Sequence, residues 1–215
     1  MIENTYRFGR LDKPKSLVIL LHGLGSNGQD LISLAPYFAQ KLPETAFISP
    51  DAPFACDMVP PGYPNSFQWF SLQDRDPDKI LSGIKTAVPV LEAYITEQIA
   101  QYGVTADQCA LVGFSQGTMM GLYAAPRYKQ PLAGVLGYSG ALFMGNESEI
   151  ANKPPIHLIH GEADDVVPVE AFSEAKNTLT AHNFEFSGYT QSGLTHSIDE
   201  KGIESGSTFL SNVLS

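Results

Sequence analysis

The sequence has little of what disulfide-bonded, membrane-spanning or secreted proteins need. Only two cysteines, Cys56 and Cys109, occur among its 215 residues, too few for a disulfide framework or a cysteine-based metal site. No apolar run approaches the ~20 residues that a membrane-spanning helix requires. The first residues also lack the basic and apolar stretches of a signal peptide. These absences predict a cytoplasmic protein with no stable membrane insertion.

Positive charge is scarce as well. Thirteen lysines and arginines stand against 23 aspartates and glutamates, which gives a formal net charge of -10. Nucleic acids and anionic membranes bind basic patches, so we expect neither to be a standing partner. The length and the hydrophobic fraction of 43% are typical of one domain, residues 1–215, with a substantial core.

Short apolar segments alternate with helical segments along most of the chain. Continuous apolar runs predict buried strands, which we place at residues 16–21, 46–49, 109–114, 132–138, 155–160 and 185–189. Helices are predicted at residues 29–41, 76–102, 116–128 and 169–182, and a last helix ends near residue 214. This alternation predicts an α/β protein with a mostly parallel sheet and helices on both faces.

The segment 51–75 keeps neither a helical nor a strand period for long. Loops of about 25 residues are uncommon in compact domains and are usually functional or disordered. The many aromatic residues in this segment argue against disorder. We therefore expect a folded excursion that packs over a pocket and lines part of it. The alternative for each aromatic residue is that it only fixes the loop to the core.

The strand at 109–114 runs into Gly-Phe-Ser-Gln-Gly, residues 113–117. This is the G-x-S-x-G pattern of a nucleophile elbow, a strained strand-to-helix turn that exposes a serine hydroxyl at the edge of a sheet. Glycine is needed at 113 and 117 because a Cβ there would strike the neighbouring strand or helix. A glycine-rich turn without catalysis matches the same pentapeptide, so the other loops must decide between the two.

Three further loops are predicted at the same edge, because the carboxyl ends of parallel strands lie together. The loop 22–25 follows the first strand, Asp164 and Asp165 follow a later one, and His196 follows the last. The order Ser115, Asp, His is the chain order of α/β-hydrolases. His196 would take the proton of the attacking serine, and the aspartate would hold its tautomer. The loop 22–25 lacks the phosphate-binding fingerprints, which disfavours a nucleotide-binding module.

Backbone N–H groups of Leu24 and Gln116 are the expected oxyanion donors. Asp165 is the main alternative for the acid. Structural or positioning roles are predicted for the other histidines, which are His22, His157, His160 and His182. Apolar residues near the expected site predict an acyl pocket formed by Leu24, Trp69, Phe70, Met119 and Phe143.

Four motifs carry a resemblance: Leu-His-Gly-Leu-Gly (21–25), Gly-Phe-Ser-Gln-Gly (113–117), His-Gly-x-x-Asp-x-x-Val-Pro (160–168) and Gly-x-x-His (193–196). Together they resemble the phospholipase/carboxylesterase family, which includes acyl-protein thioesterases and small bacterial carboxylesterases. The resemblance implies a three-layer α/β-hydrolase without a large cap domain, with Ser115 as nucleophile, Asp164 as acid and His196 as base. It implies no metal and no cofactor, and it leaves a homodimer as an alternative to a monomer.

These patterns favour a serine carboxylesterase that hydrolyses short- to medium-chain esters of small molecules through an acyl-enzyme on Ser115. A thioesterase or lysophospholipase acting on long acyl chains is the alternative within the same chemistry. The sequence departs from the eukaryotic thioesterases across residues 50–75, whereas Gln-Trp-Phe at 68–70 resembles a tryptophan motif beside the pocket of the bacterial branch. A non-catalytic protein that binds an apolar ligand in the same cleft is the alternative from another class.

Overall fold

The six predicted apolar strands and one further strand pair into one sheet of seven strands in the order β1-β3-β2-β6-β7-β8-β9. In the computed structural model, which describes residues 2–60 and 62–215, the strands are β1 (Thr5–Gly9), β2 (Ser16–Leu21), β3 (Thr45–Pro50), β6 (Cys109–Phe114), β7 (Gly134–Tyr138), β8 (Ile156–Gly161) and β9 (Phe186–Gln191). All neighbours from β3 to β9 run parallel, and the edge strand β1 is antiparallel. The predicted mostly parallel sheet is confirmed.

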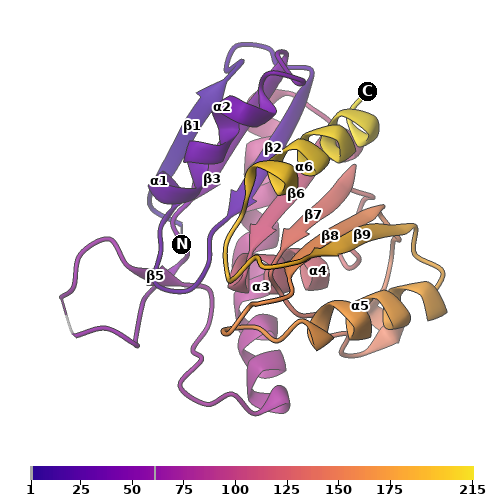
Figure 1. The fold of residues 1–215 in the computed structure, drawn as a ribbon. Coiled ribbons are helices and arrows are strands. Elements are labelled where there is room, and N and C mark those ends of the chain that lie inside the picture. Colours follow the sequence, from indigo (N-terminus) through magenta and orange to yellow (C-terminus); the bar gives the residue numbers. More distant parts are fainter. Residues whose placement is uncertain (1, 61) are drawn as a thin grey trace.

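Helices cover both faces of this sheet, and no large cap domain stands on it in the described ranges (Figure 1). One face carries α1 (Gly28–Leu31), α2 (Ala35–Phe38) and α6 (Glu200–Val213). The other carries α3 (Pro77–Tyr102), α4 (Gln116–Ala124) and α5 (Glu170–Ala181). None of these helices combines the length and the apolar character that crossing a membrane would need. The three-layer α/β-hydrolase fold is therefore confirmed.

Strand β2 shows how the sheet separates two hydrophobic clusters. Leu17, Ile19 and Leu21 belong to the cluster beneath α3 and α4, whereas Val18 and Leu20 belong to the cluster beneath α1, α2 and α6. Successive side chains of a strand point to opposite faces, so a strand buried on both sides reads as a continuous apolar run. All six residues of β2 are buried.

The prediction differs from the structure at three elements. The single helix expected at 29–41 is broken into α1, a 3-10 turn at Ile32–Leu34 and α2, because Pro36 has no N–H with which to continue an α-helix from the preceding turn. The helix expected to reach residue 128 ends at Ala124, shortly before Pro126. Strand β1 was not predicted, because its half-exposed sequence carries no continuous apolar run.

The described residues of the excursion, 51–60 and 62–75, are folded. A short hairpin of β4 (Phe54–Ala55) and β5 (Phe67–Gln68) lies at its base. Figure 1 shows that the described residues between these two strands extend away from the three layers. After β5 the chain returns to the carboxyl edge of the sheet and enters α3, so this excursion borders the edge where the candidate site lies.

Candidate active site

Ser115 occupies a strained turn between β6 and α4. Its backbone has φ 54° and ψ -115°, a conformation that is uncommon for any residue other than glycine. The turn is held by its neighbours, since the Ser115 amide donates to the carbonyl of Tyr138 at 2.9 Å and its carbonyl accepts from Met119 at 3.2 Å. This is the geometry of a nucleophile elbow.

The two flanking glycines are required by close backbone contacts. A Cβ on residue 113 would lie 2.4 Å from the amide nitrogen of Thr118, and one on residue 117 would lie 1.8 Å from the carbonyl oxygen of Leu21. Neither neighbour is a flexible side chain that could move aside. The glycines therefore allow α4 to begin directly against β2 and β6, which brings the serine to the sheet edge.

Asp164 and His196 meet at the same edge from two different loops. Asp164 lies in the turn after β8 and His196 in the loop between β9 and α6, and His196 Nδ1 lies 2.8 Å from Asp164 Oδ2. The Asp164 side chain is fully buried, whereas Asp165 is exposed. The structure thus brings Asp164, and not Asp165, to the histidine.

The surroundings of Asp164 keep its carboxylate ionised. Burial by itself would raise its pKa, but hydrogen bonds from His196 and from the amides of Val167 and Val166 outweigh burial and lower the pKa below its ordinary value. Both amides donate to Oδ1 at 2.9 Å. An ionised Asp164 accepts a hydrogen bond from the N–H at His196 Nδ1, so the proton of a neutral imidazole stays on Nδ1 and Nε2 is free to accept a proton.

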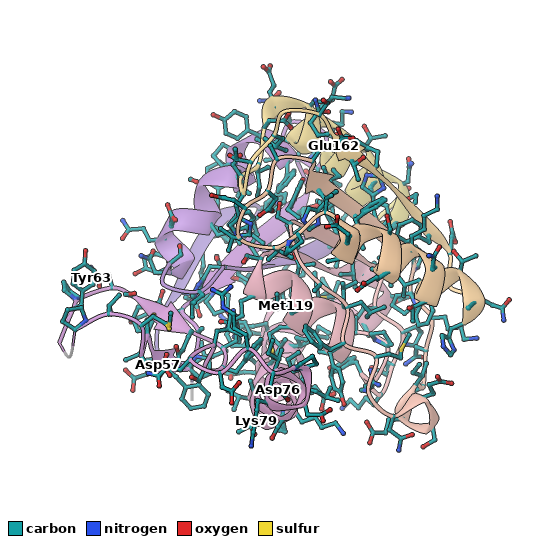
Figure 2. All side chains as sticks on the ribbon, turned by 60° about the horizontal axis from the view of Figure 1, so that its bottom comes forward. Asp57, Tyr63, Asp76, Lys79, Met119 and Glu162 are labelled. Carbon is teal, nitrogen blue, oxygen red and sulfur yellow. The ribbon has the colours of Figure 1, made fainter. Side chains whose placement is uncertain are left out.

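A cavity of about 420 Å³ adjoins this constellation and is lined by both Ser115 and His196. Figure 2 views the molecule with this edge turned forward, and Met119, on α4, lies near the centre of the view. The rest of the lining consists mainly of apolar side chains: Leu24, Leu31, Leu72, Ile80, Phe114, Met119, Val166, Val167 and Pro168. A site of this kind suits a small apolar ligand.

Two of the predicted pocket residues, Leu24 and Met119, line this cavity. Within the described ranges, Trp69, Phe70 and Phe143 are not part of its lining. Trp69 is fully buried and Phe70 is only 3% exposed, while Phe143 packs against the core cluster beneath α3 and α4. Chain proximity to the site did not indicate that these three side chains pack away from this cavity, and their contact with substrate stays a prediction.

Several lining residues were not predicted. Leu72 and Arg75 come from the end of the excursion, and Val166 and Val167 from the acid turn itself. The excursion has no periodicity from which the direction of a side chain could be read. The Val-Val pair could have been suspected, because it directly follows the predicted acid in the sequence.

The expected oxyanion donors are the residue after the serine and a residue of the loop after β2. Gln116 is the first residue of α4, so its amide has no acceptor within the helix, and it lies at the helix end where backbone dipoles favour negative charge. Leu24 lies on the loop after β2 and lines the same cavity. Their role in binding an oxyanion remains a prediction.

The other histidines contact polar groups outside the cavity. They are His22, His157, His160 and His182, and none of them contributes to its lining within residues 2–60 and 62–215. His160 Nε2 lies 2.8 Å from the carbonyl of Val167 and 3.4 Å from Asp164 Oδ2, so it supports the acid turn. Nor do three or more His, Cys, Asp or Glu side chains gather as a metal site in the same ranges.

His157 is expected to make the stability of the folded protein depend on pH. Its ring lies between the hydroxyls of Ser187 and Ser205, and burial lowers its pKa from the ordinary value of 6.5. Below that value the unfolded chain binds more protons than the folded one, so acidification favours unfolding. We expect the free energy of unfolding to fall between about pH 7 and about pH 5, and His157→Gln to weaken this fall. Urea denaturation at both pH values measures it.

Burial also lowers the pKa of His22, so part of the pH dependence will persist in the variant. A His157→Gln protein whose unfolding free energy fell as steeply as that of the parent would contradict the assignment to His157.

Comparison with known proteins places the chain among hydrolases. Residues 10–214 match the family model described as Phospholipase/Carboxylesterase. The acyl-protein thioesterase 1 of Kluyveromyces lactis is 29% identical over 98% of each chain. Esterase YpfH of Escherichia coli is 27% identical, covering 90% of this chain and 81% of its own. The crystal structure of esterase PE8 shares 37% identity over 97% of this chain and 98% of its own, with a TM-score of 0.89.

Proposed function

Because the chain belongs to the phospholipase/carboxylesterase family of α/β-hydrolases, we propose that it is a serine carboxylesterase acting on small esters of short to medium acyl chain, as a single domain. The observation that carries the proposal is the cavity that Ser115 and His196 share, with Asp164 hydrogen-bonded to the far side of the imidazole. A protein that only binds an apolar ligand needs neither the strained serine nor the buried acid.

The reaction follows from the roles of these three groups. Ser115 Oγ attacks the ester carbonyl carbon while His196 Nε2 takes its proton, and the amides of Leu24 and Gln116 hold the resulting oxyanion. Collapse of this intermediate breaks the bond to the alcohol, which leaves with the proton from His196. A water molecule then attacks the acyl carbon while His196 takes its proton. The bond to Ser115 Oγ breaks, the carboxylic acid leaves, and Oγ regains the proton from His196. Asp164 stabilises the imidazolium in both halves.

The size of the cavity favours short and medium acyl chains. Its volume of about 420 Å³ lies towards the lower end of the ~300–1,000 Å³ usual for small-molecule sites. The similarity to proteins named acyl-protein thioesterase supports a second candidate, hydrolysis of long-chain thioesters or lysophospholipids by the same groups.

A series of p-nitrophenyl esters separates these candidates. We expect kcat/KM to be higher for the butyrate and octanoate than for the palmitate, and no hydrolysis of any member would refute the proposal. Met119 lies in the cavity wall, so Met119→Ala should raise the palmitate-to-butyrate ratio of kcat/KM by about tenfold. Palmitate preference in the parent would favour the second candidate.

Met120 provides the matched control for this variant. It is fully buried on the same helix and does not appear in the cavity lining of the described ranges. Met120→Ala makes the same truncation and should leave the ratio unchanged, since a ratio of two substrates does not depend on how much of the protein is folded. An equal change in both variants would show that Met119 does not limit chain length.

A further inference from the structure

The two expected oxyanion donors come from separate loops, so contacts between these loops must determine the distance between the two N–H groups. Leu24 follows β2, whereas Gln116 begins α4. Both N–H groups must converge on one oxygen, and a misplacement of about 1 Å in an active site can lower the rate by ~10². Contacts that fix the two loops relative to each other would therefore affect the rate of the proposed reaction.

The side chain of Gln116 joins the elbow to the excursion. It is fully buried. Its Oε1 accepts from the amide of Trp69 at 2.8 Å, and its Nε2 donates to the carbonyl of Phe70 at 2.8 Å. The amide group thus pairs with the backbone of residues 69 and 70 much as a neighbouring strand would, and it fixes the position of this segment relative to the start of α4.

The side chain of Trp69 joins the same segment to the other donor loop. Its indole Nε1 donates to the carbonyl of His22 at 3.0 Å, two residues before Leu24. The indole is fully buried, so its position is determined by packing as well as by this bond. His22 is itself fixed, because its Nε2 accepts from the amide of Ala52 at 2.9 Å.

Phe67 adds a second connection between the excursion and the loop after β2. Its carbonyl accepts from the amide of Gly25 at 2.8 Å, and its amide donates to the carbonyl of Ser26 at 2.9 Å. The loop that carries Leu24 is therefore held at both ends by the excursion, through His22 on one side and residues 25 and 26 on the other.

We infer that Trp69 is a positioning residue that holds the loops of Leu24 and Gln116 at the separation an oxyanion hole requires. This inference rests on the proposed function. It gives Trp69 a role other than the substrate contact expected from the sequence: the residue acts on the reaction through its indole N–H and its backbone amide, each bonded to one of the two loops.

Replacing Trp69 by 3-benzothienylalanine tests the inference, because this residue keeps the shape of the indole and lacks its N–H. We expect kcat for the butyrate ester to fall about tenfold while KM stays within about twofold. Affinity for a trifluoromethyl ketone should fall by the same factor as kcat/KM, since its hemiketal oxygen occupies the oxyanion position. The melting temperature shows that the variant is folded.

Leu72→Ala provides the contrast expected of a wall residue, because Leu72 lines the cavity; it should raise KM more than it lowers kcat. If the Trp69 variant showed that same pattern, or kept the kcat of the parent, the inference would be overturned.

A measurement without substrate separates this inference from the proposed function. Hydrogen exchange of the backbone amides of residues 22–26 should be faster in the benzothienylalanine variant than in the parent. Unchanged exchange there would show that the indole N–H of Trp69 does not hold the loop of Leu24, and this result would overturn the inference even in a protein that hydrolyses no ester. Failure of the parent on every ester would refute the proposed function, whereas the exchange measurement would still report whether Trp69 holds the loop.

Discussion

Ser115→Ala is expected to lower the turnover of p-nitrophenyl butyrate by about 10⁴- to 10⁶-fold. The substitution removes the hydroxyl oxygen on which we propose that the acyl-enzyme forms, while the short side chain keeps the turn. The buried hydrogen bond from residue 115 to the carbonyl of Tyr138 is made by the backbone, so it survives the change. Steady-state hydrolysis, together with thermal unfolding of both proteins, measures the effect.

Ser139 offers a matched control for this variant. It is a buried serine at the end of the next strand, β7, and it also has a positive φ, 46°. It does not appear in the cavity lining of the described ranges. Ser139→Ala should keep most of the activity. If the Ser115 variant retained the turnover of the Ser139 variant, Ser115 would not be the nucleophile.

Asp164→Asn should lower turnover by about 10⁴-fold, the second large effect. The carboxylate now accepts hydrogen bonds on both oxygens, from His196 on Oδ2 and from Val166 and Val167 on Oδ1. An amide has only one acceptor oxygen. Whichever way it turns, it either opposes the two backbone amides or offers an N–H to the imidazole and favours the wrong tautomer. Hydrolysis of the butyrate ester across neutral pH measures the loss.

Asp165→Asn is the control for the acid, because this neighbouring residue is exposed. We expect its turnover to stay within a few-fold of the parent. A larger loss in the Asp165 variant than in the Asp164 variant would show that the hydrogen bond between His196 and Asp164 is not the one used in the reaction.

The elbow was predictable because its pattern is local. The strand before Ser115, the two glycines and the helix after it lie within a few residues of one another, and the close approaches of residues 113 and 117 to Thr118 and Leu21 explain why glycine must stand there. The same holds for the central strands, whose apolar runs reflect burial on both faces.

Residue spacing does not determine which of the two aspartates, Asp164 or Asp165, contacts the histidine. Both lie in the same turn, and residue spacing alone left both available for the acid; the resemblance favoured Asp164. In the structure the amides of Val166 and Val167 turn towards Asp164, and its side chain is the buried one. Such a difference depends on the conformation of one turn, which the residue types do not determine.

Trp69 shows a second feature that the sequence does not determine, which is the direction in which a side chain of an irregular segment packs. An apolar residue in an irregular segment beside a site can line the pocket or pack into the core, and without periodicity the sequence does not distinguish these outcomes. Here the indole packs inward and bonds to the carbonyl of His22. Leu72 and Arg75, from the same segment, line the cavity instead. Which residues of the excursion line the cavity and which pack into the core therefore depends on its three-dimensional conformation.

Labelling with a fluorophosphonate probe, followed by mass spectrometry of the modified peptide, tests the central claim most directly. The probe reacts with an activated serine and needs no knowledge of the natural ester. We predict a single adduct on Ser115, lost in the Ser115→Ala protein and formed far more slowly in the Asp164→Asn protein. An unlabelled folded parent, or an adduct on another residue, would contradict the assignment of Ser115 as the nucleophile.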